Sequence, residues 1–401
     1  MILALAWILA GSVAVPALVL ALECAVGACR SVRPGGIREA DRLPCIVLMP
    51  AHDEARGIAA AVAAVLAQLR GQDELVVVAD NCTDDTAAIA RSLGATVIER
   101  VDPVHRGKGH ALEFGRAFIE GQRAGHPFAT VIVIDADCLP LAGAIRALSA
   151  ASTRRDAVVQ GAYLMTSPAD AEPVVRVSCF AFLIKNLVRQ LGLDGLAGAA
   201  LLQGSGMAFP RPVFAGMRWS AASLVEDLDM GVDLLLAGQR VVFEGAAGFT
   251  SAASSARGTA GQRRRWEHGM IQSATRFVPR LIAAACAGRP RLAFVALDLL
   301  VPPTVLLIVL LAGATALCLA TLGLATLGLT TLDLAGPTLL LLGAGLALAA
   351  TLTAAWWRHG RAVLPAASLG RIPGYVLWKL PLLVQFVTRR ERNWIRTERG
   401  P

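Results

Sequence analysis

Stretches without a single charged side chain lie at both ends of this chain and constrain its fold strongly. Residues 1–22 carry no charge, and residues 299–332 and 334–357 form two further uncharged runs. A helix of the first run would be about 33 Å long at about 1.5 Å per residue, enough to cross a bilayer core. We therefore expect three membrane spans. The first lacks a basic region before it and is longer than the apolar part of a signal peptide, so a retained anchor is favoured over a cleaved peptide.

Basic residues predict the orientation of these spans. Arginines follow the first run, precede the second and follow the third, whereas the short loop between the second and third carries only Asp333. Since short cytoplasmic loops carry the excess of Lys and Arg, we expect an integral protein of the inner (cytoplasmic) membrane whose middle part is cytoplasmic. The net charge of +8 then reflects this bias and an arginine-rich tail rather than nucleic-acid binding.

The chain is expected to have three parts. An N-terminal transmembrane anchor covers residues 1–30, and a cytoplasmic domain covers residues 43–290. A C-terminal membrane region at 291–401 holds the other two spans, an apolar segment at 372–387 and the basic tail. Because Pro and Gly interrupt that segment, an interfacial helix is favoured there over a further span. The eight cysteines form no Cys-x-x-Cys pair, so free thiols are expected.

Strand and helix patterns alternate between about residues 44 and 245. Apolar runs at 45–49, 75–79 and 131–134 predict buried strands, and the stretches between them predict helices. This repeat favours an α/β fold, a mostly parallel sheet with helices on both faces. Residues 250–260 are rich in Ser, Ala, Gly and Thr, which predicts a mobile loop.

Two carboxylates separated by one residue follow the strand expected at 131–134. Successive side chains of a strand point to opposite faces, so Asp135 and Asp137 can lie on the same side. Mg²⁺ and Mn²⁺ prefer such oxygen ligands and are often shared with substrate phosphates. Open α/β sheets bind ligands at the carboxyl ends of their strands. The pair thus predicts a metal-bound diphosphate, whereas a solvated turn or a helix cap is the plainer interpretation of an isolated Asp-x-Asp.

Polar segments also follow the first two strands and begin a later helix. The sequence Pro-Ala-His-Asp-Glu at 50–54 can approach a base or ribose, and the acceptors from Asp80 onward can bind a nucleobase imide. Both segments also fit ordinary helix starts. Lys108 stands between two glycines whose backbone amides can approach an anion, although this is not a Walker P-loop.

Two later segments contain groups suited to group transfer. Glu226 and Asp227 fit the positive end of a helix dipole, and a carboxylate there can also accept the proton of an attacking hydroxyl. In Gln262-x-x-Arg265-Trp266, the arginine can stabilise a departing diphosphate and the tryptophan can stack on a sugar. Composition alone favours a basic cluster that binds anionic lipid.

In their order along the chain, these segments resemble the motifs of membrane-bound family 2 glycosyltransferases, the group of cellulose, hyaluronan and poly-N-acetylglucosamine synthases. The resemblance covers residues 44–270, and Gln262-x-x-Arg265-Trp266 is its most specific part. It implies the GT-A nucleotide-sugar fold, a Mg²⁺ or Mn²⁺ cofactor and a nucleotide-sugar donor, with UDP as the expected nucleotide. The chain departs from the family at Ala79, where many relatives are acidic, in lacking a clear Phe-x-Val-Thr gating loop, and in having few spans.

The resemblance also implies roles for single residues. Asp227, beside Glu226, would be the catalytic base. Asp135 and Asp137 would bind the metal ion, with Asp137 the more direct ligand. The donor would contact Pro50, Ala51, Glu54, Asp80, Lys108, Asp135, Asp137, Gln262, Arg265 and Trp266, and the acceptor side would be lined by Gly204, Ser205, Gly206 and Trp266.

The implied reaction is a single inverting displacement at the cytoplasmic membrane face. An acceptor hydroxyl, on a lipid or a polysaccharide, attacks the anomeric carbon while the metal and Arg265 stabilise the leaving nucleoside diphosphate. One alternative is a processive exopolysaccharide synthase that needs a partner subunit for export. Another is a non-catalytic, membrane-anchored protein that binds sugar nucleotides, which the presence of all the carboxylates disfavours. A transporter is disfavoured because its spans would need polar groups.

Overall fold

The computed structural model describes residues 2–32, 42–168, 171–219, 225–253, 256–326, 334–377 and 379–380, without the side chains of residues 2, 256–265 and 267. The chain forms two compact units. We call them the sheet unit, which comprises Ser31–Pro168 and Gly198–Ala253, and the helical unit, which comprises Met1–Arg30, Ala169–Ala197 and Ser254–Pro401.

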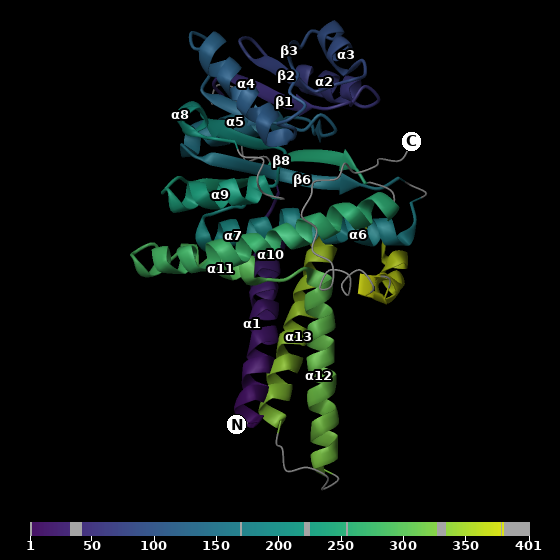
Figure 1. The fold of residues 1–401 in the computed structure, drawn as a ribbon. Coiled ribbons are helices and arrows are strands. Elements are labelled where there is room, and N and C mark those ends of the chain that lie inside the picture. The colour runs from purple at the N-terminus through teal and green to yellow at the C-terminus, as the bar shows by residue number, and fades with distance from the viewer. Residues whose placement is uncertain are drawn as a thin grey trace. The chain divides into compact units, whose positions relative to one another are not determined.

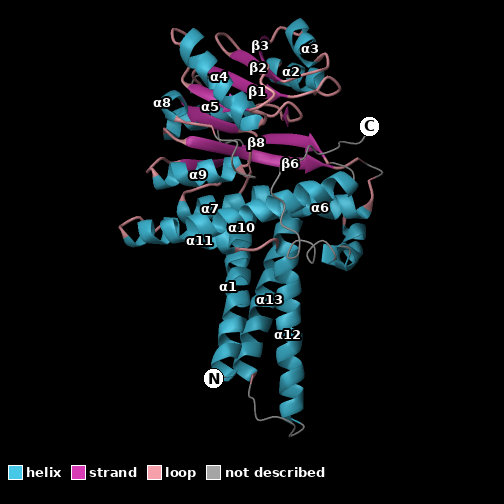
Figure 2. Ribbon diagram, in the orientation of Figure 1, coloured by secondary structure: helices cyan, strands magenta, loops and turns pink. Residues whose placement is uncertain are grey.

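The sheet unit is built on one eight-stranded sheet with the order β3-β2-β1-β4-β7-β6-β8-β5. Figure 2 shows its strands in magenta, with helices packed around them. The first four strands in this order are parallel, as are β6 and β8, whereas β7 is antiparallel to both β4 and β6, and β5 is antiparallel to β8. The strands are β1 (Cys45–Ala51), β2 (Glu74–Asp80), β3 (Thr96–Arg100), β4 (Thr130–Val133), β5 (Leu139–Pro140), β6 (Val158–Thr166), β7 (Met207–Pro210) and β8 (Val241–Ala252).

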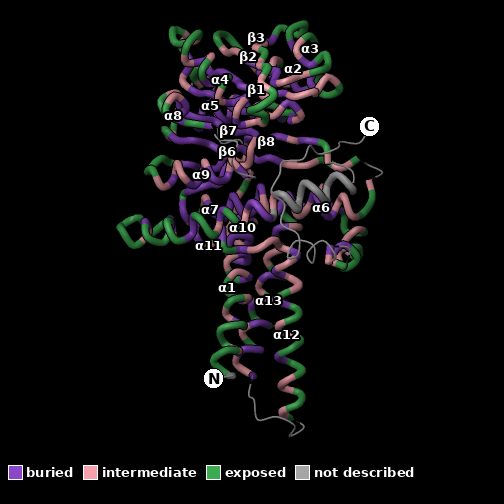
Figure 3. Tube along the Cα trace, viewed as in Figure 1, coloured by how far each residue is buried: buried purple, intermediate pink, exposed green. Residues whose placement is uncertain are grey.

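The central strands of this sheet consist of continuous apolar runs, which is the pattern expected of strands that are covered by helices. Every residue of β4 is buried, and β1 and β2 are buried along nearly their whole length (Figure 3). Strands covered on both faces lose the alternation of polar and apolar residues. Helix α4 packs tightly, since a Cβ on Gly115 would lie 2.5 Å from Leu48 Cδ1. The helices are α2 (Ile58–Leu66), α3 (Thr86–Ser92), α4 (Lys108–Gln122), α5 (Ala144–Arg155), α8 (Arg211–Gly216) and α9 (Glu226–Leu236).

Three helices of the helical unit are long and apolar enough to cross a membrane, within the residues that the structure describes. They span Leu3–Cys29, Thr304–Thr326 and Ala335–Gly360. Within this unit they run side by side, and further helices lie across one end of them (Figure 1). The elements are α1 (Ile2–Cys29), α6 (Pro173–Leu183), the π-helical η2 (Ile184–Val188), α7 (Arg189–Ala197), α10 (Ala256–Cys286), α11 (Leu292–Leu300), α12 (Thr304–Thr326), α13 (Ala335–Ala355), η3 (Trp356–Gly360) and η4 (Ala366–Arg371).

Helices α1 and α7 approach each other so closely that only glycine fits at their crossing. A Cβ on Gly27 would collide with the carbonyl oxygen of Val188, and one on Gly192 with the backbone of Glu23. Arg189 joins three helices there. Its Nε lies 2.9 Å from Glu23 Oε2 and its Nη2 lies 2.6 Å from Asp298 Oδ1, and all three side chains are buried.

One prediction from composition was wrong in detail. The loop expected at 250–260 is largely regular structure, because β8 continues to Ala252 and α10 begins at Ala256. The small residues pair with β6 there, and Ser251 Oγ lies 3.0 Å from Tyr163 Oη in a buried contact. The span expected in the second apolar run is found as α12, which begins at Thr304 after the prolines at 302 and 303.

The outcome for the apolar segment at 372–387 is partial. Residues 372–377 are helical, and Tyr375 is buried in a cluster with Val177, Val305 and Leu364. Residues 381–387 lie outside the described part of the chain. All eight cysteines are free thiols, as expected.

Candidate active site

Lys108 connects two loops of the sheet unit at the start of α4. Its ammonium group forms an ion pair with Asp135, which follows β4, and donates a hydrogen bond of 2.6 Å to the carbonyl oxygen of Gly204. Burial lowers the pKa of Lys108, but the nearby carboxylates of Asp135, Glu226 and Asp227 outweigh burial and hold that pKa above its usual value. Lys108 is therefore a fixed positive charge among carboxylates.

Asp135 and Asp137 form a compact acidic cluster with Cys138. One oxygen from each carboxylate and the Cys138 sulfur all lie within 4.8 Å of one another. Burial raises the pKa of the Cys138 thiol well above its usual range, and the charges of Asp137 and Asp135 add to this effect. Burial also raises the pKa of Asp135, against the opposing effect of Lys108. Two close oxygen ligands at a strand end fit a hard divalent cation.

A loop between α7 and β7 forms another side of the site. The backbone N–H of Asp135 donates to Ser205 Oγ at 3.1 Å, and that of Gly206 donates to the carbonyl of Val133 at 2.9 Å. Gly204 and Gly206 have φ angles of 90° and 67°, a left-handed region that side chains rarely adopt. The two glycines let the loop turn beside the carboxylates.

Glu226 and Asp227 begin α9, as expected, and lie near this loop. A Cβ on Gly204 would lie 3.2 Å from Asp227 Oδ2, so the carboxylate of Asp227 stands next to the carbonyl that Lys108 binds. Burial, and then the charge of Asp227, raise the pKa of Glu226 to about 7. The structure thus brings Lys108, Asp135 and Asp227 together from three separate segments of the sequence.

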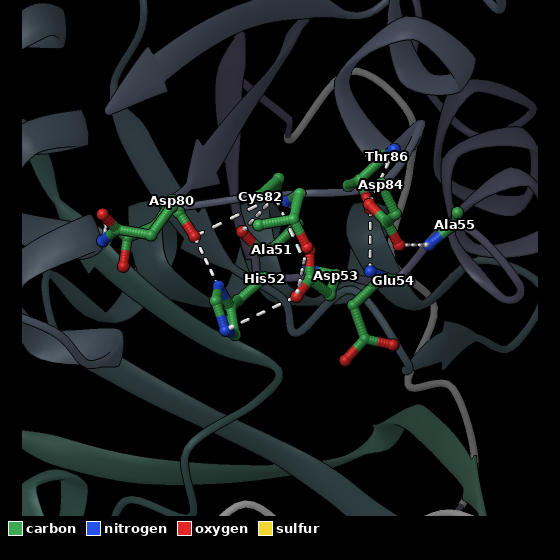
Figure 4. A network of polar contacts seen from close by, with 11 residues as sticks. Ala51, His52, Asp53, Glu54, Ala55, Asp80, Cys82, Asp84 and Thr86 are labelled. Carbon is green, nitrogen blue, oxygen red and sulfur yellow. Dashed lines mark hydrogen bonds and ion pairs between the residues drawn. The ribbon is translucent and has the colours of Figure 1, made fainter. Parts of the chain in front are cut away.

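The loops after β1 and β2 are joined by side-chain to backbone hydrogen bonds (Figure 4). Asp53 Oδ1 accepts a bond of 2.6 Å from the backbone of Thr83, and Thr86 Oγ1 accepts one of 2.8 Å from the backbone of Glu54. Asp53 and Asn81 both have a φ of 50°, an uncommon backbone conformation for residues other than glycine. Such strain at the carboxyl ends of adjacent strands is frequent at binding sites.

Asp80 is held by an arginine on the neighbouring strand. Its Oδ1 lies 2.6 Å from Arg100 Nη1 and accepts a further bond of 3.0 Å from Asn81 Nδ2. His52 Nδ1 donates to the carbonyl of Asp80 at 2.6 Å. Pro50 and Ala51 are the last two residues of β1, so they end the strand instead of starting the loop.

The remaining predicted site residues lie on α10 in the helical unit. The Trp266 ring packs against that of Phe182, with 5.8 Å between the ring centroids. The side chains of Gln262 and Arg265 lie outside the described part of the chain. Two residues of this region were not predicted: Arg100, which pairs with Asp80, and Gln160, whose buried amide contacts the loop that contains Gly204.

The sequence family agrees with this fold and site. The model of the glycosyltransferase-like family 2 matches residues 44–269, which is more than half of the chain. The chain therefore belongs to glycosyltransferase family 2, and it is an enzyme of that family with the expected GT-A fold. No curated protein matches the chain.

Solved structures with the same fold are distant in sequence. The chain is similar to the mannosyltransferase PcManGT from Pyrobaculum calidifontis in complex with GDP-Man and Mn²⁺, at 18% identity and a TM-score of 0.56, over 96% of this chain and 99% of that one. It is also similar to glucosyl-3-phosphoglycerate synthase from Mycobacterium tuberculosis in complex with Mn²⁺, UDP and phosphoglyceric acid, at 18% identity and a TM-score of 0.38, over 58% and 78%. The first match confirms the predicted fold class over nearly the whole chain.

Proposed function

We propose that this protein is an inverting glycosyltransferase that moves a sugar from a nucleotide-sugar donor to a lipid or polysaccharide acceptor. The observation that carries the proposal is the grouping of Asp135, Lys108 and Asp227 around the carbonyl of Gly204. Asp135 follows β4 and Asp80 ends β2, and both strands are parallel to β1, so both carboxylates lie at one edge of the sheet. Ligands bind at that edge in open α/β sheets.

The acidic cluster is proposed to hold a Mg²⁺ or Mn²⁺ ion through Asp135 and Asp137. When bound, the ion stabilises the negative charge of the departing diphosphate. Both solved structures described above contain Mn²⁺, one with GDP-Man and the other with UDP. A UDP-sugar is the proposed donor and a GDP-sugar the first alternative to test.

Asp227 is proposed as the base that takes the proton of the attacking hydroxyl. Asp227 must be ionised to accept a proton, and a full negative charge on the neighbouring Glu226 would oppose the ionisation of Asp227. Because Glu226 has a pKa of about 7, it is partly protonated near neutral pH, which lessens that repulsion. Lys108 contributes a positive charge next to the same carboxylates.

The membrane part supports an acceptor at a lipid surface. Arginines flank the apolar helices on one side, so the sheet unit is proposed to be cytoplasmic, with the anchor at 1–30, the catalytic domain at 43–290 and the membrane region at 291–401. The three apolar helices within the described residues are few for a chain that exports its own polymer. Single transfer to a lipid is therefore proposed ahead of processive synthesis with an export partner.

Replacement of Asp227 by Asn tests the proposal. Membranes with the full-length protein are incubated with radiolabelled UDP- and GDP-sugars and Mn²⁺ or Mg²⁺, and the labelled lipid or polymer is counted and sized. We expect Asp227→Asn to lower transfer by at least about 10³-fold while nucleotide binding persists, since the base acts in the transition state. EDTA should also stop transfer by the wild type.

Asp233→Asn is the matched control, because this carboxylate lies on the same helix α9. It is expected to keep wild-type transfer. Near-wild-type turnover by Asp227→Asn would rule out Asp227 as the base, and the absence of transfer from every nucleotide sugar would contradict the proposed function.

A further inference from the structure

Gln160 is a fully buried polar residue in β6, and its amide is bonded at both ends. Its Nε2 donates to the carbonyl oxygens of Ser205 at 2.9 Å and Gly161 at 2.8 Å, and its Oε1 accepts a bond of 2.8 Å from the backbone of Gln203. None of its surface is exposed. A buried amide whose oxygen and nitrogen are both bonded fixes the positions of its partners, because any movement leaves a polar group without a bond.

The backbone that Gln160 holds is the backbone that holds the acidic site. The carbonyl oxygen of Ser205 accepts a hydrogen bond from Gln160. The hydroxyl oxygen of the same Ser205 accepts a hydrogen bond of 3.1 Å from the backbone N–H of Asp135. Gly204 lies between the two loop residues that bond to Gln160. Its carbonyl oxygen accepts a hydrogen bond of 2.6 Å from the ammonium group of Lys108. A displacement of this loop therefore moves both the backbone of Asp135 and the cation paired with its carboxylate.

The loop needs such a support because its own backbone is not regular. Residues 201–206 form neither helix nor strand. At Gly204 and Gly206 the chain adopts left-handed φ angles, and glycine loses more conformational freedom on folding than any other residue. Gly206 is tied to the sheet by its bonds with Val133 and Gly161, so Gln160 acts on the part of the loop that precedes this attachment.

We propose that Gln160 is a positioning residue of the donor and metal site, acting through residues 203–205 on Lys108 and Asp135. This inference rests on the proposed function, in which these two residues hold a metal-bound diphosphate. Gln160 does not touch the reacting atoms. It fixes the position of the Lys108 ammonium group relative to Asp135 before the donor binds, and such preorganisation is what a charged transition state requires.

Gln160→Met tests the role, because methionine has a similar length and makes no comparable hydrogen bond. Gln160→Glu is the second variant: it keeps an acceptor for the Gln203 N–H but removes the donor to Ser205. The matched control is Ser152→Ala. Ser152 is also buried, and its hydroxyl donates at 3.0 Å to the carbonyl of Ala157, just before β6 begins.

The first measurement uses Mn²⁺ alone, titrated into each full-length variant in detergent and followed by the electron paramagnetic resonance of the free ion. We expect both Gln160 variants to bind Mn²⁺ about tenfold more weakly than the wild type, a difference of about 1.4 kcal/mol. Ser152→Ala should bind it as the wild type does. Hydrogen exchange gives a second readout, and the amide of Gln203, which donates to Gln160 Oε1, should exchange faster in Gln160→Met only.

The transfer assay adds a third readout, in which kcat for the Gln160 variants falls at least about tenfold while KM for the donor rises less. Wild-type Mn²⁺ affinity in both Gln160 variants, or wild-type protection of the Gln203 amide in Gln160→Met, would overturn the inference. An equal loss in Ser152→Ala would also overturn it, since the effect would then follow from general destabilisation. If the wild type transfers no sugar, the proposed function fails, whereas the Mn²⁺ and exchange measurements still decide the role of Gln160.

Discussion

Glu226, which begins α9 beside Asp227, has a pKa close to neutral pH. Burial and the charge of Asp227 raise its pKa from the usual 4.5 to about 7. A raised carboxyl pKa means that the folded protein binds a proton more tightly than the unfolded chain does. Protonated Glu226 therefore favours the folded state, and ionised Glu226 opposes it.

The pH dependence of stability follows from this pKa. Between pH 4.5 and about 7, the folded protein holds more protons than the unfolded chain, so the contribution of Glu226 to stability falls as the pH rises. Glu226→Gln removes the cost of ionisation. We expect this variant to be more stable than the wild type above pH 7, by about 1–3 kcal/mol, with the difference vanishing below pH 4.5.

Melting temperatures of the detergent-solubilised protein across this pH range measure the effect. Glu99→Gln, which removes an exposed carboxylate on β3, is the control. If the melting temperatures of Glu226→Gln and the wild type changed with pH in the same way, the raised pKa of Glu226 would be contradicted.

For single residues, the sequence predicted which side chains lie near the site but not which hydrogen bonds and ion pairs keep them in position. Asp135, Lys108 and Asp227 were all expected near the donor, and the structure brings them together; their roles stay predictions. Gln160 was not predicted, because a glutamine in a strand belongs to no motif and its partners in the loop, Gln203 and Ser205, lie more than forty residues away. Arg100 was missed because its pairing with Asp80 depends on the register of β2 and β3.

Among the helices, the crossing of α1 and α7 depends on glycine. Gly27 and Gly192 allow the two backbones to touch, which brings Arg189 within reach of Glu23 and Asp298. Removing one member of such a buried charged set leaves the others without compensation. At this crossing the close backbone contact and the buried ion pairs of Arg189 therefore depend on each other.

Gly27→Ala is expected to loosen this crossing. The added methyl group would collide with the carbonyl of Val188, and overpacking of this kind costs about 1–3 kcal/mol. Gly11→Ala is the matched control on the same helix, because a Cβ there meets no atom within 4 Å. Thermal stability in detergent should fall for Gly27→Ala only, and equal melting temperatures for the two variants would contradict the tight crossing.

Element types were predicted better than element ends. The parallel strands and the three apolar helices are found where apolar runs predicted them. The segment at 250–260 misled, because Ser, Ala and Thr are common in loops but here pair with β6 and then begin α10. Composition reports local preference, whereas the pairing partner comes from a strand about ninety residues earlier.

For the whole molecule, the flanking arginines predict on which side of the membrane each segment lies. In a cysteine-free background, a cysteine in place of Thr330, which follows α12 and precedes α13 in the sequence, should react with a membrane-impermeant maleimide in intact cells. A cysteine in place of the exposed Gly121 in α4 should react only after the membrane is permeabilised. The reverse pattern of labelling would mean that the sheet unit lies outside.

The position of β7 in the sheet affects how the chain is made. β7 pairs with the free edge of β4, yet Met207–Pro210 follows Thr130–Val133 only after β5, α5, β6, α6, η2 and α7. At about 5–20 residues per second, a ribosome needs several seconds to reach β7 after β4. During that time the edge of β4 that will pair with β7 stays open on a wholly buried strand, and such edges are prone to aggregate. Helices α6 and α7, which belong to the helical unit, are therefore synthesised before β7 can pair with β4. Neither unit can be complete before part of the other has been synthesised.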